Sequence, residues 1–122
     1  MKWMLDTNAC IPLKKRLDAA HPTDVVVCKA ELYFGAARSS DPARTLSNQQ
    51  RFLAAFVSLP FDDRAADAYG RIRAALASAG TPIGPNDLLI ASIAEANGVM
   101  LVTHNTSEFS RVPGLSLDDW EV

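Results

Sequence analysis

The sequence lacks features that would each point to a particular class of protein. No stretch approaches the ~20 consecutive apolar residues that span a membrane, and the start shows no signal-peptide pattern, so we expect a cytoplasmic protein without membrane contact. The two cysteines, Cys10 and Cys28, form no CxxC or other metal-binding spacing, and we expect buried thiols rather than a disulfide. The net charge of −2 lacks the basic excess typical of many nucleic-acid-binding domains.

The composition that remains is that of a globular protein. A hydrophobic fraction of 48% over 122 residues predicts one domain, residues 1–122, with a single core. Residues 1–61 carry eight Lys and Arg against five Asp and Glu. Within that half, residues 14–16 with Lys29 and Arg38 form either a basic rim or a solvated helix face.

Short apolar runs alternate with longer helical patterns along the chain. Strands are predicted over residues 1–5, 25–28 and 99–102, with a weaker candidate over 115–118. Helices are predicted over residues 8–17, 30–38, 45–57, 65–79 and 85–96, the last apolar on most sides and therefore central. The alternation predicts an α/β domain with a parallel sheet covered on both faces. In such sheets ligands bind beyond the carboxyl ends of the strands.

Carboxylates occupy positions where these strands end or helices begin. Asp6 follows the first strand, Glu31 comes shortly after the second, and Asp87 opens the most apolar helix. Each has a structural alternative: Asp6, Thr7 and Asn8 are all good helix N-caps, and Asp87 gains ~0.3 to 1 kcal/mol from the helix dipole. Glu31 alone reads as a surface residue. Their common position at strand ends favours a shared site.

Convergence of three carboxylates would require a compensating positive charge. Two charges about 4 Å apart repel by ~4 kcal/mol at an effective dielectric near 20. The only nearby cation in sequence is Lys29, which we expect to point away from Glu31. Carboxylate oxygens without Cys or adjacent His favour Mg²⁺ or Mn²⁺ over Zn²⁺. Such an ion orients a phosphodiester and acidifies a water, so metal-assisted phosphodiester hydrolysis is the leading hypothesis.

A set of motifs runs in a fixed order along nearly the whole chain. The motifs are MLDTN, KAELYFGAARS, LPFD, GTPIGPNDLLIAS, LVTHNTSEF, RVPGL and the terminal DDW. Together they resemble the PIN-domain ribonucleases, specifically the VapC toxins of type II toxin-antitoxin pairs. The resemblance implies a three-layer α/β/α fold with a central, mostly parallel sheet, and cleavage of tRNA or other structured RNA by a metal-activated water. It also implies a VapB-like antitoxin that covers the groove, and a homodimer.

The resemblance also implies roles for individual residues. Asp6 and Asp87 match the positions that bind Mg²⁺ or Mn²⁺, and Glu31 completes the acidic catalytic group directly or through water. Thr7 or Asn8 supports the site, and we expect one of them to cap the helix after Asp6. Thr103 and Asn105, after the third strand, are the further supporting positions.

The chain departs from the family pattern in two places. Many PIN domains have a further Asp where this chain has Asn105, which brings no charge and is compatible with one metal ion. Glu108 lies too far beyond that position for its spacing to assign it the role. The VVVCKAEL passage is shorter than usual and lacks a Ser or Thr cap before Glu31.

Other readings of the sequence fit less well or remain open. A receiver-like phosphoacceptor needs a Lys after a late strand, and residues 99–122 contain none. A phosphatase with an Asp nucleophile usually has a second Asp two residues on, where Asn8 stands. His104 reads as a loop histidine rather than a general base. The open alternative is a non-catalytic PIN-like module that binds RNA or an antitoxin.

Overall fold

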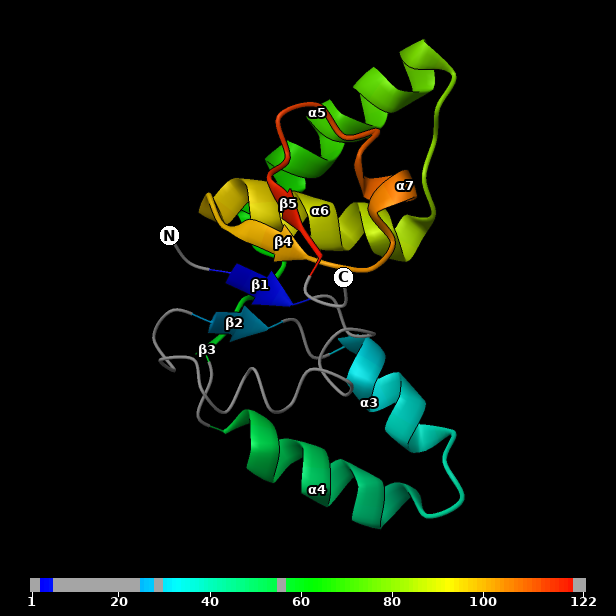
Figure 1. Ribbon diagram of the computed structural model, residues 1–122, viewed down its shortest axis with the longest axis vertical. Helices are drawn as coiled ribbons and strands as arrows, with labels where there is room; N and C mark the ends of the chain where they lie inside the picture. Colours follow the sequence, from blue (N-terminus) through cyan, green and yellow to red (C-terminus); the bar gives the residue numbers. More distant parts are fainter. Residues whose placement is uncertain (1–2, 6–24, 28–29, 55–56, 120–122) are drawn as a thin grey trace.

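A parallel sheet forms the centre of the protein in the computed structural model, which describes residues 3–5, 25–27, 30–54 and 57–119 (Figure 1). The strands are β1 (Trp3–Leu5), β2 (Val25–Val27), β3 (Val57–Ser58), β4 (Met100–Val102) and β5 (Leu117–Asp118). Their order is β3-β2-β1-β4-β5, and every pairing is parallel. The predicted parallel sheet is therefore confirmed.

The register aligns the ends of the three central strands. Leu5 of β1 pairs with Val27 of β2 on one side and with Val102 of β4 on the other. Because the strands are parallel, the chain leaves all three at the same edge of the sheet. Polar segments that follow these strands in sequence therefore start from one edge.

The helices form two groups on opposite sides of the sheet. They are α3 (Ala30–Ala37), α4 (Pro42–Leu53), α5 (Asp63–Ala79), α6 (Pro85–Asn97) and the single-turn α7 (Thr106–Phe109). In the view of Figure 1, α3 and α4 lie towards β2 and β3, whereas α5, α6 and α7 lie towards β4 and β5. Helix α6 contacts both α5 and β4, and α7 contacts β5. None of the helices in the described residues is long and apolar enough to cross a membrane.

Helix α6 lies in the core, as its apolar sequence predicted. Consecutive residues from Ile90 to Ala94 are buried, including Ser92, whose hydroxyl donates to the carbonyl of Leu88 at 2.6 Å. The core around α6 includes Met4 of β1 and Leu101 of β4. A helix buried on most sides fixes the position of the residues at its first turn.

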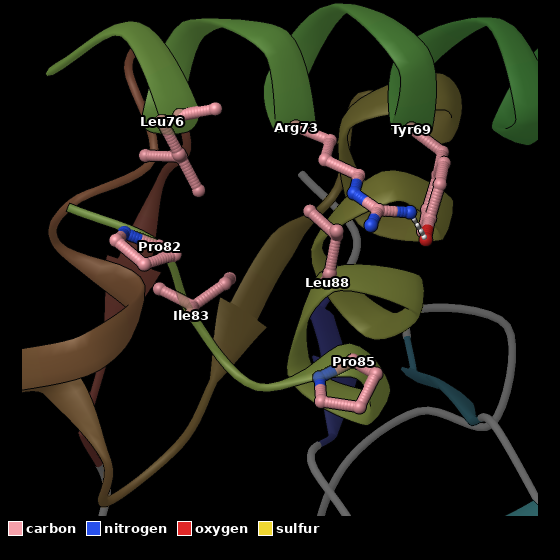
Figure 2. A pocket seen from close by; sticks show the side chains of 8 residues that line it. Tyr69, Arg73, Leu76, Pro82, Ile83, Pro85 and Leu88 are labelled. Atoms are coloured by element: carbon pink, nitrogen blue, oxygen red, sulfur yellow. Dashed lines mark hydrogen bonds between the residues drawn. The ribbon is translucent and has the colours of Figure 1, made fainter. Parts of the chain in front are cut away.

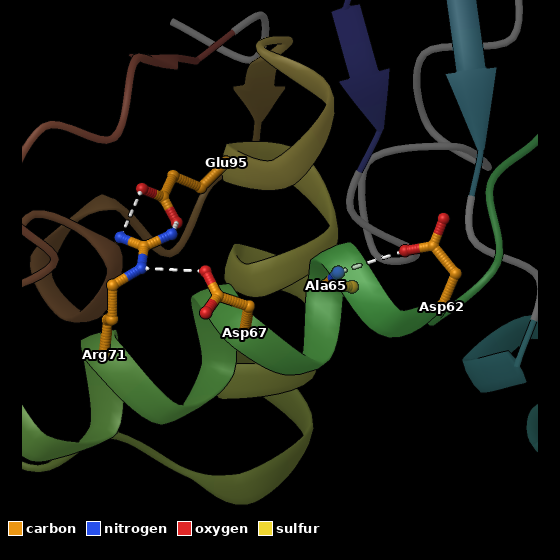
Figure 3. Close-up of polar contacts among 5 residues, drawn as sticks. All are labelled: Asp62, Ala65, Asp67, Arg71 and Glu95. Carbon is orange, nitrogen blue, oxygen red and sulfur yellow. Dashed lines mark hydrogen bonds and ion pairs between the residues drawn. The ribbon is translucent and has the colours of Figure 1, made fainter.

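Helix α5 is defined by local signals at its ends. The Asp62 carboxylate accepts a hydrogen bond from the Ala65 N–H at 3.0 Å, which starts the helix two residues before the predicted start (Figure 3). At the other end Gly80 adopts φ +71, a left-handed conformation that glycine tolerates, and it ends the helix. Arg71 links α5 to α6 through an ion pair with Glu95 at 3.2 Å, and it also contacts Asp67 of its own helix at 3.1 Å.

The helix predicted over residues 45–57 is wrong at both ends. Helix α4 begins at Pro42 because the Asp41 carboxylate accepts from the Arg44 N–H at 3.3 Å and proline suits the first helical turn. It ends at Leu53, and Val57 instead begins β3, where it pairs with Val26. The short α7 was not predicted. The helix predicted over residues 8–17 lies outside the described residues.

Candidate functional site

The site begins at the carboxyl end of β4, where Thr103 fixes the path of the chain. Thr103 is 1% exposed, and its backbone N–H donates to the carbonyl of Asp118 at 2.9 Å. Its hydroxyl oxygen accepts a hydrogen bond from the backbone N–H of Asn105 at 3.0 Å. Thr103 therefore holds the turn that carries Asn105 away from the sheet and into α7.

The Asn105 side chain connects two carboxylates from different helices. Its Nδ2 donates to Oε2 of Glu108 at 3.0 Å and is 3.4 Å from Oδ2 of Asp87. Asn105 occupies the N-cap position of α7 but makes no side-chain capping bond there. Its amide is instead used to hold Asp87, in the first turn of α6, near Glu108.

The loop before α6 provides a second donor to the same acidic group. The backbone N–H of Gly84 donates to Oε1 of Glu108 at 2.6 Å. A Cβ placed on Gly84 would lie 3.5 Å from that oxygen and 3.9 Å from Oδ2 of Asp87. The carbonyl of Gly84 also accepts from the Leu88 N–H at 2.9 Å, in the first turn of α6. Gly84 is thus fixed in position facing both carboxylates.

These donors keep Glu108 negatively charged. The hydrogen bond from Gly84 lowers the pKa of Glu108 most, followed by the hydrogen bond from Asn105 and a hydrogen bond shared with the carboxyl group of Asp87. The positive charge of Arg111 lowers this pKa further, whereas partial burial acts in the opposite direction. The cluster of Asp87, Asn105 and Glu108 thus offers carboxylate oxygens and one amide oxygen, which are hard ligands.

The structure brings together some of the predicted site residues. Asp87, Thr103 and Asn105 lie in one cluster at the carboxyl edge of the sheet. Glu31 lies in the first turn of α3, which follows β2 at the same edge, but its side chain is outside the described part. Asp6, together with Thr7 and Asn8, also lies outside the described residues. Their roles, and that of Glu31, stay predictions.

Glu108 is the site residue that sequence reasoning missed. The sequence spacing does not bring it beside Asn105 unless residues 106–109 form a helical turn, and this turn, α7, is not predicted from the sequence. One helical turn places residues three apart on the same side, so Asn105 and Glu108 become neighbours. The signal was the Asn-x-x-Glu spacing at the start of a short helix.

The donor set fits a hard divalent cation but needs at least one further ligand. Among the described residues, no group of three or more His, Cys, Asp or Glu side chains is arranged to hold a metal ion. Asp87 and Glu108 supply two carboxylates, and β1 ends beside β4 immediately before Asp6. His104 is exposed, and its Nδ1 lies 3.0 Å from Oδ2 of Asp119, as suits a loop histidine.

Known proteins match this chain over nearly its whole length. The PIN domain family model matches residues 2–115. The chain is 38% identical to the tRNA(fMet)-specific endonuclease VapC of Salmonella typhimurium, with 98% of each chain covered. It is also similar to the crystal structure of DNA-bound VapBC from Salmonella typhimurium, with a TM-score of 0.89, 37% identity and 98% of each chain covered. For VapBC-1 from nontypeable Haemophilus influenzae the TM-score is 0.88 and the identity 32%, with all of each chain covered. These matches confirm the predicted α/β PIN-like fold.

Proposed function

This chain belongs to the PIN-domain family and, within it, to the VapC ribonucleases, and on that premise we propose that it is a metal-dependent endoribonuclease. It would act as the toxin of a toxin-antitoxin pair and hydrolyse RNA phosphodiester bonds. The observation that carries the proposal is the contact of Asn105 with both Asp87 and Glu108 at the carboxyl edge of the sheet.

Mg²⁺ or Mn²⁺ is the cofactor that this donor set favours. Asp87 and Glu108 would hold the ion together with Asp6, and Glu31 would complete the acidic group directly or through water. When bound, such an ion orients a phosphodiester and lowers the pKa of a water. Asn105 is neutral, so its presence limits the negative charge of the site, which favours one ion over two.

The protein's own residues prepare the site for that chemistry. Asn105 holds the two carboxylates near each other, although like charges repel. Gly84 supports Glu108 in its ionised form through a backbone N–H, which adds no side-chain bulk beside the substrate. Thr103 fixes Asn105 from the buried side. The expected result is a preorganised pair of oxygen ligands.

The names of the relatives suggest a substrate and a partner for this chain. The Salmonella typhimurium relative is tRNA(fMet)-specific, so initiator tRNA is the first substrate to test. Similar chains occur in VapBC complexes, which supports a VapB-like antitoxin as partner. We further propose a homodimer that acts in the cytoplasm, where tRNA is found.

The test is cleavage of a tRNA pool by the purified, antitoxin-free protein with Mg²⁺ or Mn²⁺. We expect EDTA to abolish cleavage, and Asp87→Asn or Glu108→Gln to reduce it by at least about 10- to 100-fold. Glu95→Gln is the matched control, because Glu95 lies on the same helix as Asp87 but contacts Arg71 instead. Cleavage that persists in EDTA would contradict metal dependence. A folded protein that binds RNA without cutting it would support the non-catalytic alternative.

A further inference from the structure

A cavity of about 450 Å³ lies between α5, the start of α6 and the loop that joins them (Figure 2). The residues around it are mainly apolar, with one cation and one phenol among them. They are Tyr69, Arg73, Leu76, Ala77, Pro82, Ile83, Pro85 and Leu88. Pockets that bind small flat molecules typically combine apolar walls with a few polar groups of this kind.

Tyr69 and Arg73 form the polar part of the wall. The Arg73 Nη1 donates to the Tyr69 hydroxyl at 3.0 Å, and its guanidinium carbon lies 5.8 Å from the centre of the ring. Figure 2 shows both side chains reaching from α5 towards Leu88 on α6. An aromatic ring and a planar guanidinium are the surfaces on which unpaired RNA bases stack.

The cavity and the acidic site share the loop before α6. Pro82, Ile83 and Pro85 line the cavity, while Gly84, between them, donates its N–H to Glu108. Arg111 reaches the same loop, where its Nη1 donates to the carbonyl of Pro82 at 2.9 Å. Neighbouring residues of one loop thus face the cavity and the carboxylates.

We propose that this cavity binds one unstacked nucleobase of the RNA, adjacent to the phosphate that lies at the acidic site. The inference rests on the proposed ribonuclease function and adds a base-binding subsite to it. Two exposed arginines complement the negative charge of the RNA backbone: Arg73 lies in the cavity wall, and Arg111 contacts the loop at Pro82 and acts electrostatically on Glu108. The apolar wall suits the faces of a base rather than a charged ligand.

The test fills the cavity without changing the acidic residues. Ala77→Phe places a ring in the cavity, and Ala75→Phe adds the same ring on the same helix but outside the cavity lining. With an initiator tRNA transcript as substrate, we expect Ala77→Phe to raise KM by about fivefold or more. Fivefold corresponds to the smallest effect expected for the loss of one stacked base. Ala75→Phe should leave KM unchanged. Arg73→Gln, at an exposed position, should raise KM in the same direction, and thermal melting verifies that each variant is folded.

A second measurement does not depend on cleavage. Asp87→Asn protein is irradiated with tRNA transcript containing 4-thiouridine, and the cross-linked peptide is identified by mass spectrometry. We expect cross-links within residues 69–88, lost in the Ala77→Phe double variant. Cross-links without cleavage by the wild-type protein would overturn the ribonuclease function and keep the base subsite. Normal cleavage with unchanged KM and no such cross-link would overturn the subsite alone. A change only in oligomeric state or antitoxin binding would also overturn it, assigning the cavity to a protein interface.

Discussion

Replacing Asn105 by Asp tests how the acidic site is balanced. The amide donates to Glu108 at 3.0 Å and to Asp87 at 3.4 Å, so the substitution turns two attractive contacts into two repulsive ones. Two unit charges about 4 Å apart repel by ~1 kcal/mol in water. Because Asn105 is exposed, solvent keeps each repulsion near that value, and the loss of the hydrogen bonds adds about 1 kcal/mol.

Asn105→Asp should therefore destabilise the metal-free protein by roughly 2 to 3 kcal/mol, which lowers Tm by roughly 5 to 15 °C for a domain of this size. A divalent cation would relieve the repulsion, so Mg²⁺ should raise the Tm of this variant more than that of the wild type. Thermal melting in EDTA and across a Mg²⁺ titration measures both effects. Asn48→Asp, at an exposed position in α4, provides the same charge change away from the site. If Asn105→Asp melts like the wild type in EDTA, or gains no extra stability from Mg²⁺, the electrostatic reasoning is wrong.

Three further substitutions test the supports of the site. Gly84→Ala should change the free energy of unfolding by less than about 0.5 kcal/mol, because the added Cβ meets Glu108 at an ordinary contact distance of 3.5 Å. Gly84→Pro is compatible with the backbone angle φ −59 but removes the N–H that donates to Glu108. It should therefore lower the free energy of unfolding by about 1 to 3 kcal/mol and abolish most RNA cleavage. Urea unfolding and a cleavage assay distinguish the two Gly84 variants. Equal stability and equal cleavage in both variants would show that the Gly84 N–H is unimportant. Asp62→Ala should cost about 1 kcal/mol in urea unfolding through loss of the α5 cap, with cleavage unchanged; a much larger loss would indicate an unrecognised role. Phe109→Ala, at a position with 0% exposure, should cost about 3 to 5 kcal/mol and reduce cleavage by displacing Glu108, and a variant as stable as the wild type would contradict the core packing.

Most elements of the fold could be predicted because their signals are local. The apolar runs of β1, β2 and β4 are bounded by polar residues, and α5 ends at a glycine with positive φ. β3 could not be predicted in the same way, since a two-residue edge strand is defined only by its pairing with β2. Its first residue, Val57, was therefore assigned to the preceding helix.

The site was predictable for the residues that follow or begin regular elements. Asp87 and Asn105 were predicted from their positions at a helix start and after a strand end, and their side chains do meet, while their roles stay predictions. Glu108 was not, because its contacts come from Asn105 across one turn and from Gly84, 24 residues earlier. Contacts between distant segments depend on the packing of α6 and α7, which local patterns do not encode.

The strand order also determines when the centre of the sheet can form during synthesis of the chain. β1 can pair with β2 early in synthesis, but its other neighbour is β4. The pairing of Trp3 with Met100, which completes the centre of the sheet, can form only after residue 100 has been synthesised. At translation rates of about 5 to 20 residues per second, that interval is roughly 5 to 20 s. The contact of Asn105 with Asp87 and Glu108 likewise needs both α6 and α7, so it forms only after residue 108 has been synthesised. A nascent chain that has not reached α7 therefore lacks the contact that joins Asp87, Asn105 and Glu108.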